Sequence, residues 1–429
     1  MTDTTITSVL GRRVWDSRGR PTVEAEVRVG GDAVGRAIAP AGASTGSGEA
    51  IDLRDGGEAF GGLDVRRAIA NVNGPIARAL VGMDAGDPAA IDAAMIALDA
   101  TPNKSRLGGN AIVATSMAVL QARARAAGLP VWRLLAGTRA VRIPLPEIQI
   151  FGGGAHAERR VDVQDFMVMC PGAGSFAEAL DWTAEIYRAA GALMRRAGKL
   201  QGVADEGGYW PVFASNEEAL DTLVLAIEHA GLAPGGEVAI SLDVAASEFG
   251  RAGSYVLALD GRTLDTAGML DMVGGWLDAY PIVSVEDPVA EDDAEGFEAF
   301  TVRHGGRCQV IGDDFLVTDA ERVERAAGDR SANAVLIKPN QAGTLAETHA
   351  ALLAGQQHGF GTVVSARSGE TEDTTIAHLA VGWDAGQLKV GSFSRSERMA
   401  KWNEVLRIEE SLGTDALFAG WSALPFRRS

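Results

Sequence analysis

The sequence predicts an α/β fold in which an N-terminal α+β domain precedes a C-terminal, TIM-like β/α barrel. Two observations carry this prediction. Strand-like and helix-like segments are mixed in the first part of the chain, and the remainder contains apolar runs that end abruptly in polar residues. The 429 residues are enough for two domains or for one large barrel with an extension. We divide the chain into residues 1–138 and 139–429, at a polar stretch interrupted by prolines.

The N-terminal domain begins with an expected hairpin. Apolar and polar residues alternate in the segments 22–31 and 33–40, which predicts two antiparallel strands joined at a glycine-containing turn. Three segments then carry apolar residues at three- and four-residue spacing, which predicts helices. These segments are residues 64–82, 88–100 and 110–128.

The C-terminal domain contains apolar, β-branched runs that predict strands buried on both faces, as in parallel sheets. The intervals between these runs fit one strand, one helix and two loops each. The runs are VAISLD, PIVSVED, CQVIGDD, AVLIKPN and TVVSARS. A closed barrel follows, because its strand ends converge on one mouth. A doubly wound sheet is the alternative, but no glycine-rich dinucleotide fingerprint follows an early strand.

Charge and composition exclude several functional classes. Asp and Glu total 57 against 39 Lys and Arg, and the resulting formal charge of -18 disfavours binding to nucleic acid or to anionic membranes. No run approaches the length of a membrane span, and the N-terminus lacks the pattern of a secretory signal. The two cysteines, Cys170 and Cys308, lie in apolar surroundings and are expected to be buried thiols. We therefore expect a cytoplasmic protein.

Charged residues at the ends of successive predicted strands indicate a metal site. Asp243, Glu286 and Asp313 would meet at the barrel mouth, where three carboxylates repel each other unless a cation such as Mg²⁺ lies between them. Lys338 follows the next strand and could act as a base near that cation. Each carboxylate alone is more typical of a helix cap, but capping does not explain four charged residues in register. Spacing alone indicates a Mg²⁺-dependent lyase, isomerase or phosphotransfer enzyme.

The chain resembles the enolase family from end to end, because a long series of segments occurs in the family's order. They are WDSRGRPTVEAEV, AGASTGSGEA, GGGAHA, QDFM, ADEGG, SLDVAASEF, YPIVSVEDPVAEDD, IGDDFLVT, LIKPNQAGTLAET, ARSGETEDT and GQLKVGSFSRSER. The resemblance implies an enolase-like fold whose early barrel strands depart from simple strand–helix alternation. A lysine base assisted by Mg²⁺ is already known in this superfamily, so the role of Lys338 follows established chemistry.

The resemblance also implies two Mg²⁺ ions. Asp243, Glu286 and Asp313 would hold a structural ion, and a second ion would lie between the substrate phosphate and Ser44. Two divalent cations would stabilise the negative charge that develops when the proton beside a carboxylate is removed.

The remaining functional residues are carried over by the same resemblance. Lys338 would remove the proton and Glu206 would protonate the departing hydroxide, with Asp205 as its acidic neighbour in the sequence. The substrate-binding residues would be Lys389 for the carboxylate, Arg367 and Ser368 for the phosphate, and His156 and Gln164 in the segments that close near the phosphate.

Four positions depart from the family's pattern in the expected pocket, and besides Trp210 and Phe151 two of them lose volume. Ala366 stands where enolases ordinarily have histidine, and Asp165 stands where they have glutamate. Both changes remove volume near the leaving group and phosphate. Arg159, next to Arg160, lies in the adjoining loop, where a guanidinium could bind an additional carboxylate, although paired loop arginines are usually solvated.

These departures leave three interpretations. The chain could be an ordinary enolase that converts 2-phosphoglycerate to phosphoenolpyruvate, or an inactive binding or structural protein. We favour a third, in which enolase-type dehydration acts on a substrate with an enlarged phosphorus substituent. The carboxyphosphono analogue used by the branch of the family that forms carboxyphosphonoenolpyruvate in antibiotic biosynthesis is such a substrate. The expected partners are therefore a small phosphorylated or phosphonylated carboxylic acid and, by resemblance, a second copy in a homodimer or larger homo-oligomer.

Overall fold

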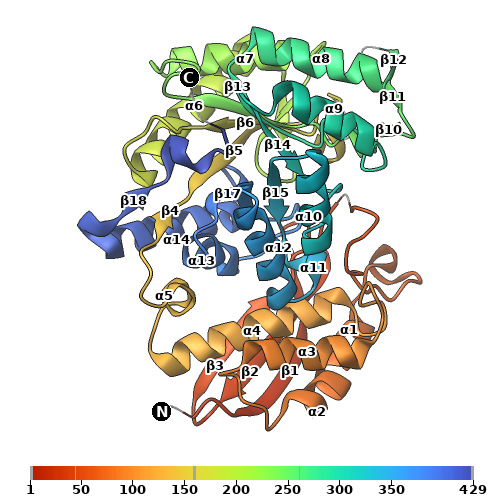
Figure 1. The fold of residues 1–429 in the computed structure, drawn as a ribbon, viewed down its shortest axis with the longest axis vertical. Helices are drawn as coiled ribbons and strands as arrows, with labels where there is room; N and C mark the ends of the chain where they lie inside the picture. Colours follow the sequence, from red (N-terminus) through yellow and green to blue (C-terminus); the bar gives the residue numbers. More distant parts are fainter. Residues whose placement is uncertain (1–2, 44, 158–160, 260, 427–429) are drawn as a thin grey trace.

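The computed structural model describes residues 3–43, 45–157, 161–259 and 261–426. It contains a three-stranded antiparallel sheet packed on helices, followed along the chain by a closed barrel (Figure 1). This is the α/β arrangement that the sequence predicts.

The N-terminal sheet is formed by β1 (Ile6–Trp15), β2 (Pro21–Val29) and β3 (Ala33–Ile38), in that order. The predicted hairpin corresponds to β2 and β3, which pair antiparallel from Val29 opposite Ala33. Strand β1, which pairs antiparallel with β2, was not predicted from the sequence. Alternate side chains of β2 are buried, because one face of the sheet packs on a helix.

Helices cover this sheet as the periodicity predicts, with one difference. The first predicted helix is divided into α1 (Arg66–Asn71) and α2 (Ala77–Leu80) by a π-helical turn that contains Pro75. Proline removes a backbone donor and clashes with the preceding turn, which accounts for the interruption. The other helices are α3 (Pro88–Asp99), α4 (Gly109–Ala127) and α5 (Val131–Ala136). Of these, α4 is buried along most of its length and packs on β2 and β3.

Eight strands close the barrel, which confirms a barrel rather than a doubly wound sheet. The strands are β5 (Leu145–Gly152), β6 (Asp165–Met169), β9 (Ala239–Asp243), β13 (Ile282–Glu286), β14 (Gln309–Gly312), β15 (Ala334–Ile337), β16 (Gly361–Ser365) and β17 (Gly386–Ser392). Pairing of β17 with β5 completes the ring. Only β6 runs antiparallel to its two barrel neighbours, so its first residue lies at the same rim as the last residues of the others. This is the departure from simple alternation that the resemblance implies.

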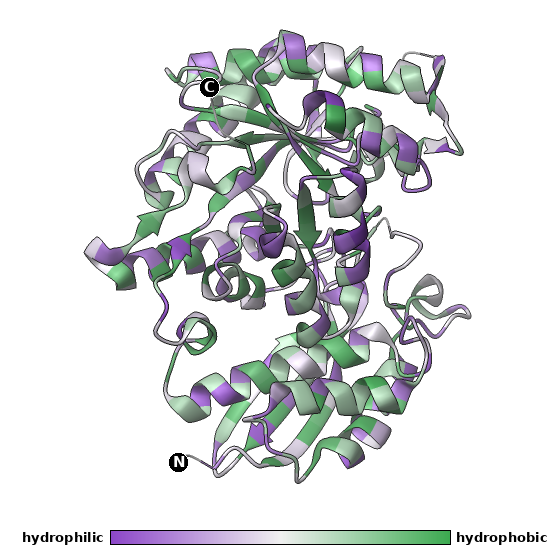
Figure 2. Ribbon diagram, in the orientation of Figure 1, coloured by the Kyte–Doolittle hydropathy of each residue, from purple (hydrophilic) through white to green (hydrophobic). Residues whose placement is uncertain are grey.

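Helices surround the barrel, and a short hairpin lies beside β5. Most of the barrel strands are largely hydrophobic, whereas the outer helices alternate in character (Figure 2). The hairpin consists of β7 (Leu200–Val203) and β8 (Tyr209–Pro211), and β8 pairs with β5. The covering helices are α6 (Phe176–Ala197), α7 (Asn216–His229), α8 (Thr266–Ala279), α9 (Ala294–His304), α10 (Ala320–Asp329), α11 (Pro339–Ala342), α12 (Leu345–Gln357), α13 (Thr375–Gly382) and α14 (Ser396–Leu412).

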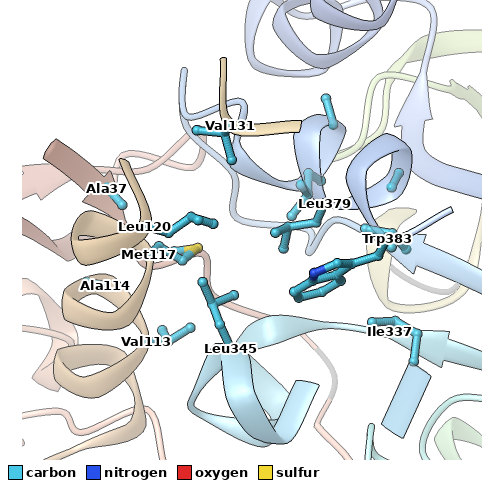
Figure 3. Close-up of a cluster of buried hydrophobic side chains, with 14 of the residues drawn as sticks. Ala37, Val113, Ala114, Met117, Leu120, Val131, Ile337, Leu345, Leu379 and Trp383 are labelled. Carbon is cyan, nitrogen blue, oxygen red and sulfur yellow. The ribbon is translucent and has the colours of Figure 1, made fainter. Parts of the chain in front are cut away.

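One hydrophobic cluster joins the N-terminal helices to the barrel helices. Met117 and Leu120 of α4 face Leu345 of α12 and Leu379 of α13, with Trp383 beside them (Figure 3). Burial of large apolar side chains from both parts fixes the N-terminal region against the barrel. The loop that follows β3 is thereby held at the barrel mouth.

Two further expectations concern the cysteines and the membrane. Cys170 and Cys308 are buried free thiols, as predicted. Among the helices of the described residues, none is long and apolar enough to cross a membrane.

We predict that Gly35→Ala destabilises the N-terminal region. A Cβ at Gly35 would lie 2.1 Å from the carbonyl oxygen of Ala118 and 2.2 Å from the nitrogen of Ala122, both in the backbone of α4. Backbone atoms cannot move aside cheaply, so overpacking should cost about 1–3 kcal/mol. Thermal unfolding followed by circular dichroism should show a midpoint lowered by several degrees. Gly31→Ala is the matched control, because a Cβ there meets nothing within 4 Å; equal midpoints for the two variants would contradict the prediction.

Candidate active site

Most of the site residues expected from the sequence line one small cavity at the barrel mouth. These lining residues are His156, Gln164, Asp165, Glu206, Asp243, Lys338, Ala366, Arg367, Ser368 and Lys389. Glu286 and Asp313 are buried next to the lining residues rather than in the lining itself. Ser44 and Arg159, together with Arg160, lie outside the described residues.

The fold explains why residues so distant in sequence meet. Asp243 and Glu286 are the last residues of neighbouring parallel strands and pair in register. Asp165 begins the antiparallel β6 and pairs in register with Asp243 from the other side. The carboxyl ends of β14, β15 and β16 bring their following residues to the same rim.

Lys389 binds two of the predicted metal ligands directly. Its Nζ donates to Asp243 Oδ2 at 2.9 Å and to Glu286 Oε2 at 2.7 Å, and Asp165 Oδ2 lies 3.8 Å away. Burial on its own would lower the pKa of Lys389, but the charges of Asp243 and Glu286 outweigh it and raise that pKa well above its ordinary value. Lys389 is therefore a buried cation held by carboxylates of several strands.

The third predicted ligand pairs with the other lysine. Lys338 Nζ donates to Asp313 Oδ2, and Gln341 Nε2 donates to Asp313 Oδ1 at 2.8 Å. Burial would lower the pKa of Lys338, but attraction to Asp313 outweighs it and raises that pKa. A bound cation would move the pKa of Lys338 toward neutrality, whereas the protein's own carboxylates raise it.

A second group of charged residues lies on the β5 side of the cavity. His156 Nδ1 is 3.0 Å from Asp165 Oδ1, and His156 Nε2 is 3.7 Å from Glu206 Oε1. Burial would lower the pKa of His156, but the two carboxylates outweigh it and raise that pKa to about 9. Gln149 Nε2 also donates to Asp165. Glu206 therefore has His156 as a neighbour in the fold, in addition to Asp205, which is adjacent to it in the sequence.

The residues after β16 form another part of the cavity wall. Ala366 is a buried residue of the cavity lining, 7% exposed as a whole, and its N–H donates to the Lys389 carbonyl at 2.9 Å. Arg367 Nη1 donates to Glu49 Oε2 at 2.8 Å, and burial, which would lower the pKa of Arg367, is outweighed by Glu49, so that this pKa is raised. Glu49 was not identified as a site residue, although it stands in the quoted segment AGASTGSGEA.

Two polar residues in the barrel interior were also missed. Glu147 and Gln149 lie on β5 and are fully buried. Glu147 Oε2 accepts from Ser241 Oγ at 3.2 Å, and burial raises the pKa of Glu147 to about 7. Their signal was the polar pair at alternate positions in an otherwise apolar run, which marks side chains on one face of a strand.

The residues at the mouth fit a divalent cation. Glu286 Oε1 and Gln164 Oε1 are buried oxygen atoms without a hydrogen-bond partner in the described part of the chain. Burial, then repulsion from Asp243, raises the pKa of Glu286 well above its ordinary value, so additional positive charge would be favourable there. Such an all-oxygen donor set is the one that Mg²⁺ prefers.

The three predicted metal ligands, Asp243, Glu286 and Asp313, nevertheless do not converge on one point. Within the described ranges, one oxygen each of Asp287, Asp313 and Asp314 lie within 4.8 Å of one another, whereas the predicted trio does not form such a group. Asp243 and Glu286 accept hydrogen bonds from Lys389, and Asp313 accepts one from Lys338. The two lysines therefore neutralise the negative charge of these carboxylates, which a bound divalent cation would also neutralise.

Comparison with known proteins identifies the same family over both regions of the chain. The family model described as "Enolase, N-terminal domain" matches residues 6–135, and "Enolase, C-terminal TIM barrel domain" matches residues 140–425. A similar curated protein is Enolase 1 of Desulfitobacterium hafniense (strain Y51). It is 49% identical over 416 residues, which cover 96% of this chain and 95% of that protein.

We predict that Mg²⁺ stabilises the folded protein through Glu286. A ligand that binds the native state at a concentration far above its dissociation constant should raise the unfolding midpoint by roughly 3–5 °C. Glu286→Gln keeps the shape but removes a charge next to Asp243, so the Mg²⁺-dependent shift should fall to a small fraction of the wild-type value. The measurement is thermal unfolding with magnesium chloride and with chelator.

The control for this measurement is Glu298→Gln, which removes one exposed carboxylate on α9. It should leave the magnesium shift at the wild-type size. A shift in Glu286→Gln as large as in the control would show that Mg²⁺ acts elsewhere.

Proposed function

This chain belongs to the enolase family, and on that premise we propose that it is a Mg²⁺-dependent hydro-lyase for a 2-phosphoglycerate-like acid with an enlarged phosphorus substituent. The carboxyphosphono analogue, which would give carboxyphosphonoenolpyruvate, is the substrate we assign. The observation that carries this choice is the methyl wall of Ala366, at a position where the family ordinarily has histidine.

The proposed reaction begins with removal of the proton beside the substrate carboxylate. We assign this step to Lys338, whose side chain lines the cavity at the end of β15. A bound divalent cation would favour its neutral amine, which is the form that can accept the proton. Lys389 would bind the substrate carboxylate, because it offers a buried positive charge two strands away from β15. A positioned base of this kind typically contributes 10²–10⁴-fold to the rate.

The elimination ends with protonation of the departing hydroxide. We assign this step to Glu206, which lines the cavity from the connection between β7 and β8, beside β5. Base and acid would thus approach the substrate from different sides of the barrel mouth. His156 lies within 3.7 Å of Glu206 and would orient that carboxyl group.

Mg²⁺ held by Asp243, Glu286 and Asp313, with a second ion near Ser44, would supply the positive charge that stabilises the intermediate. Burial of these carboxylates excludes water and strengthens their charge interactions. Releasing Asp243 and Glu286 to a cation would also free Lys389 to meet the substrate.

The phosphorus end of the substrate is assigned to Arg367 and Ser368. Both line the cavity immediately after Ala366, so a vacated side chain at 366 would enlarge this end in particular. The negative charge of Asp165 is compensated by His156 and Lys389, which lowers its repulsion toward an additional carboxylate. Volume and charge therefore both support a larger, more anionic substituent.

Ordinary enolase activity is the second candidate. The observation that favours it is the 49% identity to Enolase 1 over nearly the whole chain. An inactive binding protein receives less support, because the carboxylates, both lysines and Glu206 remain at one cavity.

We predict that the purified protein with Mg²⁺ dehydrates the carboxyphosphono substrate and turns over 2-phosphoglycerate at least about 100-fold less efficiently. A pocket that leaves space unfilled around a smaller substrate typically lowers kcat/KM for that substrate by a factor of this size. The measurement is the ultraviolet absorbance of the conjugated product, as kcat/KM for both substrates. Ala366→His with Asp165→Glu should raise kcat/KM for 2-phosphoglycerate and lower it for the larger substrate.

Efficient turnover of 2-phosphoglycerate by the wild-type protein would instead establish the ordinary activity and end the larger-substrate proposal.

Lys338→Ala should lower kcat by roughly 10²–10⁴-fold on either substrate, because it removes the proposed base. Lys199→Ala is the matched control, because Lys199 lies outside the cavity and pairs with Glu218. Unchanged turnover in Lys338→Ala would exclude its role as the base.

A further inference from the structure

The turn between β1 and β2 reaches from the N-terminal region to the barrel mouth. Asp16 Oδ1 accepts from the backbone N–H groups of Arg18 at 2.9 Å and Arg20 at 2.8 Å, which fixes the turn. The backbone N–H of Ser17 donates to the Glu370 carbonyl at 2.8 Å, across 353 positions of sequence. A rigid turn is therefore docked beside the loop that follows β16.

Arg18 uses this position to contact two loops of the cavity at once. Its Nη1 donates to Ser368 Oγ at 3.2 Å, and its Nη2 donates to the Ala41 carbonyl at 2.8 Å. Ser368 lines the cavity, and so do Gly42 and Ala43, which directly follow Ala41. One guanidinium thus links the loop after β3 to the loop after β16.

The two loops are also paired through their backbones. Ala41 and Gly369 exchange two N–H to carbonyl hydrogen bonds, of 2.9 and 2.8 Å. A Cβ at Gly369 would lie 2.4 Å from Arg18 Nη2 and 2.7 Å from the Ala41 carbonyl oxygen. The space around the guanidinium is therefore filled, and a shift of either loop would displace Arg18.

The Arg18 side chain is only 7% exposed, and its carboxylate partner Asp16 is 3.4 Å away. Its Nε is buried and has no hydrogen-bond partner among residues the structure describes. Burying a guanidinium costs desolvation free energy, which is offset only by well-placed hydrogen bonds and ion pairs. Its remaining donors point to the two cavity loops.

We propose that Arg18 is a positioning residue for the anionic phosphorus end of the substrate. It holds the Ser368 hydroxyl and the segment of Gly42 and Ala43 in one arrangement, so that both loops meet the phosphorus group together. This inference rests on the proposed function for the identity of the anion, and assigns a role to a residue of the N-terminal region that makes no contact with the reacting atoms.

Arg18→Met removes the donors but keeps most of the length. We expect KM for the turned-over substrate to rise about tenfold, with kcat changed less than about twofold, because the bound anion loses an ordered loop while the acid and base are untouched. Arg18→Lys should give a KM between those of the wild type and Arg18→Met, since the lysine ammonium can still donate to one of the two loops. Arg20→Met is the control: Arg20 is exposed on the same turn, and its replacement should leave KM and kcat unchanged.

A double-mutant cycle separates positioning from general loss of structure. If Arg18 acts through the serine hydroxyl, Ser368→Ala and Arg18→Met should raise KM by less in combination than the product of their separate effects. Multiplicative effects on KM, a loss of kcat at constant KM, or the same result in Arg20→Met would overturn the proposal. Thermal unfolding of each variant checks that it is folded. If Arg18→Met does not fold, the same cycle is measured with Arg18→Lys.

Binding of inorganic phosphate with Mg²⁺, measured by calorimetry, tests the inference independently of turnover. We expect Arg18→Met to weaken phosphate binding about tenfold relative to wild type and to Arg20→Met. Weakened binding in a protein that turns over neither substrate would refute the proposed function and leave this inference standing. Normal turnover by the wild type with phosphate affinity unchanged in Arg18→Met would refute this inference alone.

Discussion

The bonds from Lys389 to Asp243 and Glu286 are the interactions on which the site depends. All three side chains are buried, and a buried ion pair offsets its desolvation cost only when the geometry is good and both partners are present. The parallel register of β9 and β13 supplies that geometry by placing the two carboxylates side by side. Closure of the ring between β17 and β5 then brings the ammonium to them.

This charge arrangement relates the stability of the barrel to its chemistry. The same carboxylates that compensate the lysines are the oxygen donors that a divalent cation would use. Exchange of one partner for another would leave no charge uncompensated, so that binding of a metal and binding of an anionic substrate become coupled events. The buried Glu147 beneath this group adds a further acidic side chain to the interior, where most barrels have apolar residues.

The cavity is built by both parts of the chain. The barrel supplies the acids and lysines, whereas the N-terminal region supplies Glu49 to Arg367 and Arg18 to Ser368. The apolar cluster between α4 and the barrel helices makes these contacts possible, because it fixes one part against the other. Ala366 lines the same cavity, next in the chain to Arg367.

The sequence alone determined much of this picture. Apolar runs that end in polar residues identified five of the barrel strands and their carboxyl ends. The order of the family's segments identified the fold and ten of the residues that line the cavity. Strand β1 and the division of the first helix were not recognised, because pairing with β2 and the conformation around Pro75 depend on neighbours. Only the tertiary structure decided which charges pair: Lys389 with Asp243 and Glu286, Lys338 with Asp313, and His156 with Asp165. The physical reason is that strand periodicity specifies the rim on which a side chain lies, whereas its partner is selected by distances and burial among segments far apart in the chain.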